Sequence, residues 1–154
     1  LNNGSDIFDL WVADHDYFIE KFPKIIQEIK NLVSKKVEVH YFEGNHDLHL
    51  KKFWQEQLNV QVHHNHFIFK WPDITIRAEH GDLMNPDDTG YLFLRKFLRN
   101  PIMKFVAHHL PGKAVGFIGD RSSQMSRVYT DRLNQKYKET VQNLTRNYAQ
   151  KIYT

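Results

Sequence analysis

Apolar side chains recur at steps of three and four residues between Asp16 and Lys35, which predicts an amphipathic helix. Pro23 lies inside this stretch and predicts either an early kink or a helix start at Phe22. A short connector leads to residues 37–42, whose β-branched and aromatic residues predict a strand. A helix followed by a buried strand is half of a βαβ unit, so we expect an α/β fold.

The elements predicted for the middle of the chain are shorter. Residues 49–57 predict a short helix, and residues 60–62 predict a short strand. Two apolar runs at 66–71 and 74–78 flank Pro72-Asp73, and this pattern predicts a β-hairpin.

The rest of the chain is predicted to be helical. Aromatic residues alternate with cations over residues 91–110, and Pro101 should divide this stretch into two short helices. We expect a loop or short turn at 110–118 and a long polar helix from near Asp120 to Tyr153. We therefore divide the chain into part of an α/β core, residues 1–90, and a helical insert with a long helix, residues 91–154.

Composition limits the chemistry available to this chain. Its 154 residues suffice for one domain, and the absence of cysteine excludes disulfides, thiolate-bound zinc and thiol catalysis. A metal site would therefore use His, Asp, Glu or Asn, and there are ten histidines. A net charge of +3 suits a nucleic acid, an anionic membrane or a phosphorylated substrate. No apolar run is long enough for a transmembrane helix, and the first residues are not those of a signal peptide.

Three short polar segments follow predicted strands or begin the chain. Each segment contains one residue of a type that binds metal ions in proteins: Asp6, Asn45 and His80. A carboxylate at Asp6 could bridge two divalent ions, with a neutral carbonyl oxygen from Asn45 and an imidazole nitrogen from His80. Oxygen and nitrogen ligands without sulfur favour Mn²⁺, Fe, Zn or Mg, and Mn²⁺ fits best by softness.

His46 follows Asn45 directly and need not bind a metal itself. From that position it could protonate a leaving oxygen or neutralise developing phosphate charge. Asp47 or Asp9 could orient such a histidine through a hydrogen bond.

Asp6-Ile-Phe-Asp9, Gly44-Asn45-His46-Asp47 and His80-Gly81-Asp82 occur in the order typical of calcineurin-like metallophosphoesterases, and the chain resembles that superfamily. Within it, the chain is most similar to the UDP-2,3-diacylglucosamine pyrophosphatase branch of lipid A synthesis. This closer resemblance rests on Asp6-Ile-Phe-Asp9-Leu-Trp11, on Asp87-Asp88-Thr-Gly-Tyr91 and on the basic, aromatic insert that follows.

The resemblance implies a metallophosphoesterase-type β-sandwich flanked by helices, with a helical insert as a lid. It implies that Asp6 bridges two metal ions, that Asn45 and His80 bind the second, and that His46 is catalytic. Asp88 and Tyr91 would contact substrate. The implied reaction is hydrolysis of UDP-2,3-diacylglucosamine to UMP and the lipid monophosphate.

Two motifs of the family do not occur in this sequence. The initial Asp-x-His strand is missing, and so is the final Gly-His-x-His. We therefore expect a piece of a longer protein, and the alternative is a degenerate relative that binds metal poorly.

Each of these residues also has a simpler interpretation. Asp6 and Asp88 could cap helices, and His80 could be a structural histidine. We expect His63, His64 and His66 to be surface or turn residues and His40 to be a core histidine.

The helical insert could be a plain cap over the sheet. Alternatively it is a lid that accepts acyl chains and rests on an anionic bilayer through a set of cations: Arg95, Lys96, Arg99, Lys104 and Lys113. The second reading predicts a cytoplasmic enzyme, peripheral on the inner membrane. No nucleic-acid partner is expected, because the charge is mixed and no recognition motif occurs. The rival functions are a general phosphodiesterase of the same superfamily and a non-catalytic scaffold.

Overall fold

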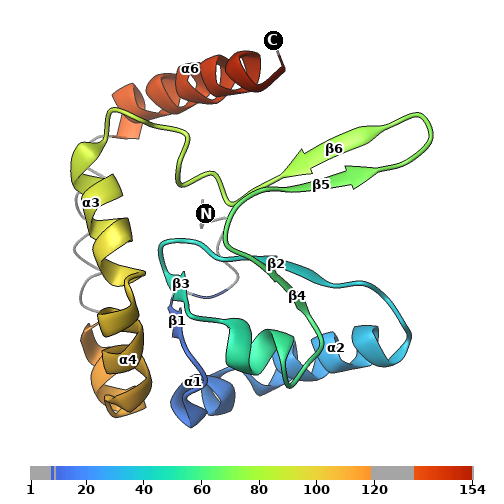
Figure 1. The fold of residues 1–154 in the computed structure, drawn as a ribbon, viewed down its shortest axis with the longest axis vertical. Coiled ribbons are helices and arrows are strands. Elements are labelled where there is room, and N and C mark those ends of the chain that lie inside the picture. The colour runs from blue at the N-terminus through green and yellow to red at the C-terminus, as the bar shows by residue number, and fades with distance from the viewer. Residues whose placement is uncertain (1–7, 9, 119–133, 154) are drawn as a thin grey trace.

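A computed structural model of the chain describes residue 8 and residues 10–118 and 134–153. Short strands and helices alternate along it, so the fold is of the mixed α/β type (Figure 1). The described strands form three separate two-stranded sheets. The complete β-sandwich and the division at residue 90 stay predictions.

The N-terminal part begins with a strand and two helices. Strand β1 (Trp11–Val12) leads into α1 (Asp16–Lys21) and α2 (Pro23–Ser34). Phe22 caps α2 from a non-helical conformation, and Pro23 occupies the first helical turn, where no backbone N–H is needed. Of the two outcomes predicted at Pro23, the structure therefore shows a new helix start.

Two parallel strand pairs position the polar turn. Strand β2 (His40–Phe42) pairs with β4 (Gln61–His63), and β1 pairs with β3 (Asp47–Leu48). The one-turn helix η1 (Lys51–Gln55) connects β3 to β4. The sequence pattern did not predict the strand at Trp11–Val12. The Trp11 N–H donates to the His46 carbonyl at 3.0 Å and extends the pairing to the turn itself.

An aromatic core supports these strands. Its largest fully buried side chains include Phe8, Trp11, Phe18 and Trp54. The rings of Trp11 and Trp54 lie 5.0 Å apart, in the tilted geometry that aromatic pairs favour. The core therefore joins β1 to α1 and α2, through Trp11, Phe18 and Ile26.

The predicted hairpin is present. Strands β5 (Phe67–Lys70) and β6 (Thr75–Ala78) pair antiparallel, with Phe69 opposite Ile76. The hairpin projects away from the other strands (Figure 1).

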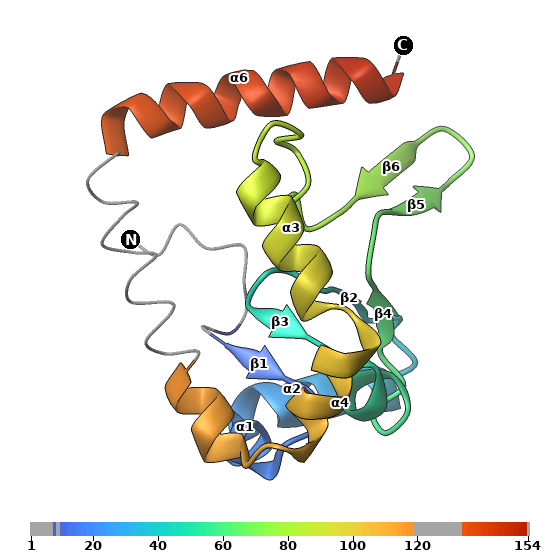
Figure 2. The ribbon, with the colours of Figure 1, turned by 60° about the vertical axis from the view of Figure 1, so that its left-hand side comes forward.

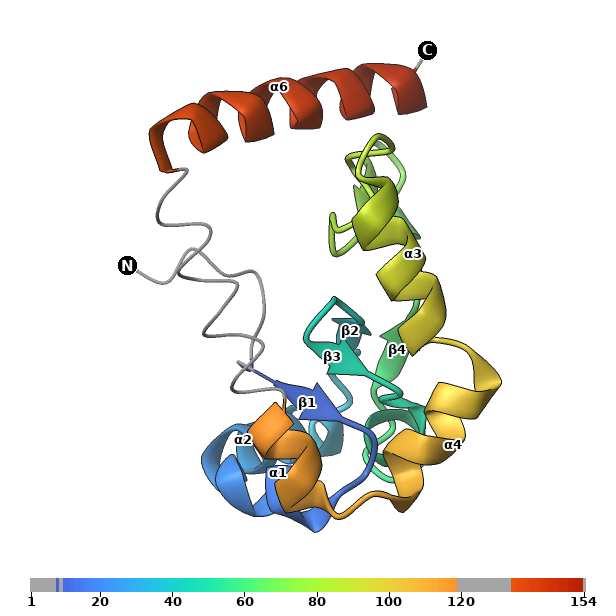
Figure 3. The ribbon, with the colours of Figure 1, turned by 90° about the vertical axis from the view of Figure 1, so that its left-hand side faces the viewer.

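The helices of the C-terminal part run along one side and across one end of the molecule (Figures 2 and 3). They are α3 (Thr89–Leu98), α4 (Pro101–His109) and α6 (Asn134–Tyr153). The predicted break at Pro101 is confirmed, and Asn100 caps α4 by accepting the N–H of Met103 at 2.8 Å. Over the part of the chain that is described, no helix combines the length and apolar character needed to cross a bilayer.

Residues 112–118 differ from the expected loop, because they are helical. This helix packs so closely on α1 that a Cβ on Gly116 would lie 2.4 Å from a ring carbon of Tyr17. Tertiary packing thus stabilises a helix at a place where the sequence pattern was ambiguous.

Candidate metal and substrate site

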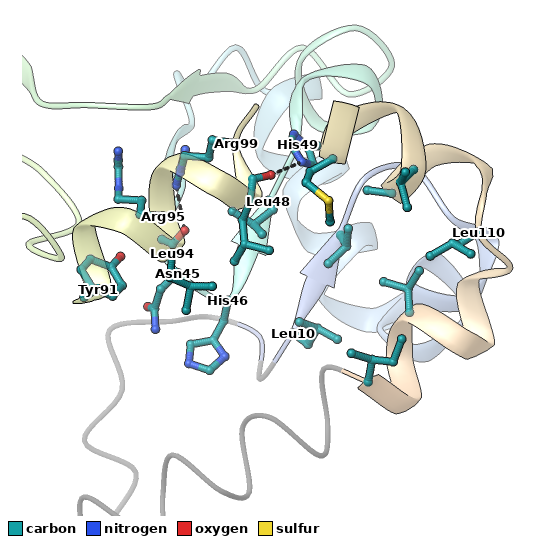
Figure 4. A pocket seen from close by; sticks show the side chains of 18 residues that line it. Leu10, Asn45, His46, Leu48, His49, Tyr91, Leu94, Arg95, Arg99 and Leu110 are labelled. Atoms are coloured by element: carbon teal, nitrogen blue, oxygen red, sulfur yellow. Dashed lines mark hydrogen bonds between the residues drawn. The ribbon is translucent and has the colours of Figure 1, made fainter. Parts of the chain in front are cut away.

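The turn at residues 44–47 joins β2 to β3 and carries the Asn-His-Asp motif. Gly44 is buried, Asn45 is exposed and His46 is half-buried. Asn45 and His46 lie next to one another at one edge of a cavity (Figure 4). The hydrogen bond from Trp11 to the His46 carbonyl holds this turn in place.

His80 lies directly against this turn. A Cβ on Gly44 would come within 2.2 Å of His80 Nε2, so the imidazole occupies the space that the glycine leaves open. The structure therefore brings together the second and third motifs, which carry Asn45 and His80. This proximity is what the metal-ligand hypothesis requires.

The donor set at this place fits a hard or borderline divalent ion. It consists of the side-chain amide oxygen of Asn45 and an imidazole nitrogen of His80. Asp6 and Asp9 lie outside the described residues. The residues that are described contain no group of three or more His, Cys, Asp or Glu side chains that could hold a metal ion. The ligand roles of Asp6, Asn45 and His80 and the orienting role of Asp9 stay predictions.

Asp82 sits behind His80. Its carboxylate lies 3.6 Å from His80 Nδ1, and it accepts hydrogen bonds from the Tyr91 hydroxyl at 2.5 Å and from Arg95 Nε at 2.8 Å. Burial alone would raise the pKa of Asp82, but His80, Tyr91 and Arg95 together hold it well below its usual range. Asp82 is therefore an anion that faces Nδ1 of His80 and leaves Nε2 directed at the turn.

The two predicted substrate residues lie at the start of α3. The Asp88 side chain caps this helix, accepting the Tyr91 N–H at 2.9 Å. Burial and the neighbouring Asp82 carboxylate raise the pKa of Tyr91, so its phenol stays protonated. The capping alternative for Asp88 is thus realised, and contacts of Asp88 and Tyr91 with substrate stay predictions.

Asp47 faces the core. It is 1% exposed and accepts the Tyr41 hydroxyl at 2.8 Å. This bond ties β3 to β2 below the turn. The structure places the Asp47 carboxylate where it supports the turn, and a role in orienting a metal-bound histidine stays a prediction.

A cavity of about 420 Å³ opens beside Asn45 and His46. Its walls come from β1 and β3 on one side and from α3, α4 and the helix at 112–118 on the other (Figure 4). Most of the lining is apolar, including Leu10, Val12, Leu98, Met103 and Val106. The arrangement places a hydrophobic chamber next to the two polar residues of the turn.

Glu43 was not singled out from the sequence, although it connects several elements. Its oxygens accept the Leu50 N–H at 2.8 Å, His64 Nδ1 at 2.6 Å and Arg99 Nη1 at 2.8 Å. Burial opposes the charged form, but these partners outweigh it and lower the pKa of Glu43. Arg99 Nη2 also donates to the Gly44 carbonyl at 2.8 Å.

Arg95 and Arg99 correct the predicted bilayer contact. Their side chains are only 17% and 16% exposed, because they point inward to Asp82 and Glu43. The prediction that these two arginines rest on a membrane was therefore wrong. Tyr91, Arg95 and Arg99 follow one another at steps of four residues, and this spacing on one helix face was the sequence signal for their role.

The other histidines are placed as follows. His64 is exposed, as expected, but it pairs with Glu43. His63 is half-buried and stacks on His40, with Nδ1 of His40 2.9 Å from Nε2 of His63. The prediction of a surface or turn residue was thus wrong for His63, and His40 packs as an inward-facing histidine.

Comparison with known proteins gives relatives named as UDP-2,3-diacylglucosamine hydrolases. No protein-family model matches the chain. It is 25% identical to a UDP-2,3-diacylglucosamine hydrolase of Psychromonas ingrahamii over 130 residues, which is 82% of this chain and 53% of that protein. It is 26% identical to hydrolases of the same name from Aliivibrio fischeri, over 69% of this chain and 44% of the relative, and from Porphyromonas gingivalis, over 66% and 39%.

The chain is similar to UDP-2,3-diacylglucosamine hydrolases. It spans about half the length, or less, of these relatives. Their name agrees with the branch indicated by Asp6-Ile-Phe-Asp9-Leu-Trp11, by Asp87-Asp88-Thr-Gly-Tyr91 and by the insert.

Proposed function

We propose that this chain carries part of the active site of a metal-dependent hydrolase that splits UDP-2,3-diacylglucosamine at the pyrophosphate, giving UMP and the lipid monophosphate. The observation that carries the proposal is the contact of His80 with Gly44. The imidazole lies against the turn that carries Asn45 and His46, and these two residues line one edge of an apolar cavity. The relatives named as hydrolases of this substrate support the same conclusion.

Two divalent ions are the proposed cofactor, Mn²⁺ by ligand softness, with Fe, Zn or Mg as alternatives. Asn45 and His80 would hold one ion, and Asp6 would bridge both. When bound, such ions polarise the phosphoryl group and lower the pKa of a water molecule.

His46 has the proposed catalytic role. Its half-buried imidazole lies at the cavity edge beside Asn45, where it can hydrogen-bond to a phosphate oxygen and donate a proton to the leaving group. Tyr91 lines the same cavity, and Asp88 caps the helix that carries Tyr91. Both side chains would contact the head group. The apolar chamber would take an acyl chain, since lipid binding sites are lined by hydrophobic side chains with few polar groups.

The outer face of the insert supports a proposal about location. It exposes large apolar side chains: Phe93, Phe97, Ile102, Phe105 and Phe117. Lys96, Lys104 and Lys113 are exposed among them. We propose that this face rests on the anionic inner membrane from the cytoplasmic side.

Substrate comparison tests the reaction. The complete natural polypeptide, with Mn²⁺, should release UMP from UDP-2,3-diacylglucosamine far faster than it hydrolyses bis-p-nitrophenyl phosphate. His46→Ala should lower turnover by about 10²-fold or more, as expected for loss of a general acid, and leave the Mn²⁺ content nearly unchanged.

Other outcomes would point elsewhere. Equal rates on both substrates would indicate a general phosphodiesterase. A protein that holds no metal and hydrolyses neither compound would be a scaffold. Parallel loss of turnover and Mn²⁺ in His46→Ala would make His46 a ligand or a structural residue.

A further inference from the structure

Tyr91 and Arg95 of α3 and Arg99, the residue that caps the C-terminus of this helix, follow one another at steps of four, and we call them the α3 stripe. Residues four apart in a helix lie on the same face, so all three can point to one partner surface. Here that surface consists of the two turns that carry Asn45 and His80. Tyr91 and Arg95 contact Asp82, and Arg99 contacts Glu43 and Gly44.

The first turn is held through its backbone. Arg99 donates from Nη1 to the Glu43 carboxylate and from Nη2 to the Gly44 carbonyl, each at 2.8 Å. The Gly44 carbonyl belongs to the peptide that leads into Asn45. A planar guanidinium with two fixed donors therefore sets the orientation of that peptide.

The second turn is held through a side chain. Arg95 donates from Nε to Asp82 at 2.8 Å and also from Nη2 to the His64 carbonyl at 3.2 Å. Asp82 faces Nδ1 of His80, so the ring presents Nε2 toward Gly44. A carboxylate behind a histidine in this way fixes the ring orientation of a metal ligand.

The carboxylates at both contacts are buried. The Glu43 and Asp82 side chains are 2% and 9% exposed. Buried charges of this kind need their partners, so the contacts hold α3 in one position. Lys96 on the same helix is exposed, so water can solvate its charge and it does not need a buried partner.

We propose that Arg95 and Arg99 are positioning residues, and that docking of α3 through them sets the relative placement of Asn45 and His80 and hence the affinity of the site for its metal ion. This inference rests on the proposed metal site, but not on the proposed substrate. It makes the insert part of the metal site as well as a wall of the cavity.

Arginine-to-lysine variants test the proposal. Arg99→Lys keeps the charge beside Glu43 but cannot bind the carboxylate and the Gly44 carbonyl with a fixed fork. We expect a melting temperature close to that of the parent and Mn²⁺ affinity lowered about 10-fold or more, measured by titration calorimetry on the complete polypeptide. Arg95→Lys should act in the same way, and Lys96→Met is the matched control that should bind Mn²⁺ as the parent does.

The outcomes separate this proposal from the proposed reaction. Mn²⁺ affinity that is unchanged in both arginine variants overturns the positioning role, even if the parent hydrolyses UDP-2,3-diacylglucosamine. Reduced Mn²⁺ affinity in a parent that does not cleave this substrate supports the positioning role and removes only the substrate. If one variant unfolds, the other decides the result. A parent that binds no Mn²⁺ overturns both proposals.

Discussion

Gly44 determines how closely His80 can approach the turn that holds Asn45. The absent side chain leaves room for the imidazole, whose Nε2 would be 2.2 Å from a Cβ. Glycine is needed here for space and not for backbone conformation, because its φ is not in the left-handed region. Because Gly44 carries a hydrogen in place of a methyl group, the motifs that carry Asn45 and His80 can lie against each other.

Gly44→Ala should therefore displace His80. We expect the free energy of unfolding to fall by about 1–3 kcal/mol, the usual cost of overpacking. Mn²⁺ affinity should fall as well, because the displaced ring would no longer lie against the turn that carries Asn45. Denaturant unfolding and metal titration measure the two effects.

Gly90→Ala is the matched control. The nearest atom to a Cβ at Gly90 is 3.8 Å away, and this residue lies in α3. Alanine there should leave Mn²⁺ binding intact and stabilise the helix by about 0.5–1 kcal/mol. If Gly44→Ala binds Mn²⁺ as tightly as Gly90→Ala does, the close approach of His80 has no part in the site.

At the scale of elements, the pairing of β2 with β4 brings two histidines together. His40 and His63 stack with their planes at 6° and share a hydrogen bond. The groups around the pair are Phe42, Phe67, Phe69 and His64, with Glu38 3.8 Å from Nε2 of His40. Burial first, and then the charges of His40 and His64, lower the pKa of His63.

This lowered pKa predicts a loss of stability in mild acid. Above the ordinary value of 6.5, His63 is neutral in both the folded and the unfolded protein. Below it the unfolded chain takes up the proton more readily, so the free energy of unfolding should decrease as the pH falls. His63→Gln should reduce this dependence between pH 7.5 and 5.5 in urea unfolding experiments. His66→Gln, at an exposed histidine, should retain it, and an unchanged dependence in His63→Gln would contradict the prediction.

At the scale of the whole molecule, α3 and α4 separate two environments. Their inner faces close the apolar cavity, while their outer faces expose phenylalanine, isoleucine and lysine side chains. A helix layer with this division is suited to pass a lipid between a bilayer and a polar site.

Binding to vesicles tests this arrangement. Lys96→Glu with Lys104→Glu should weaken binding to anionic vesicles by at least about tenfold, since each lysine near such a surface contributes about 1 kcal/mol. Vesicles should also protect residues 91–118 from protease. Lys24→Glu with Lys30→Glu changes two exposed lysines of α2 and should bind as the parent does. Equal binding by both double variants would exclude the proposed face.

The local sequence pattern was sufficient to predict most of the helices and strands. The hairpin across Pro72-Asp73 and the break at Pro101 were predicted, and a helix start was one of the two outcomes predicted at Pro23. These features depend on spacing and on proline geometry within a few residues. The strand at Trp11–Val12 was missed, since two residues are too few to form a pattern. Residues 112–118 were predicted to be a loop or short turn but are helical, and packing on Tyr17, which the local pattern does not show, helps to stabilise this helix.

By itself, the sequence determined which chemical groups are available and that Asn45, His46 and His80 lie in turns next to strands. Only the tertiary structure decided that His80 rests on Gly44 and that Arg99 turns inward to Glu43, 56 residues away in the chain. The pattern of an amphipathic helix shows that a cation can lie between its apolar and polar faces. It does not show whether a buried carboxylate lies opposite that cation. That carboxylate is brought to α3 by long-range packing of the strands, which the local sequence does not encode.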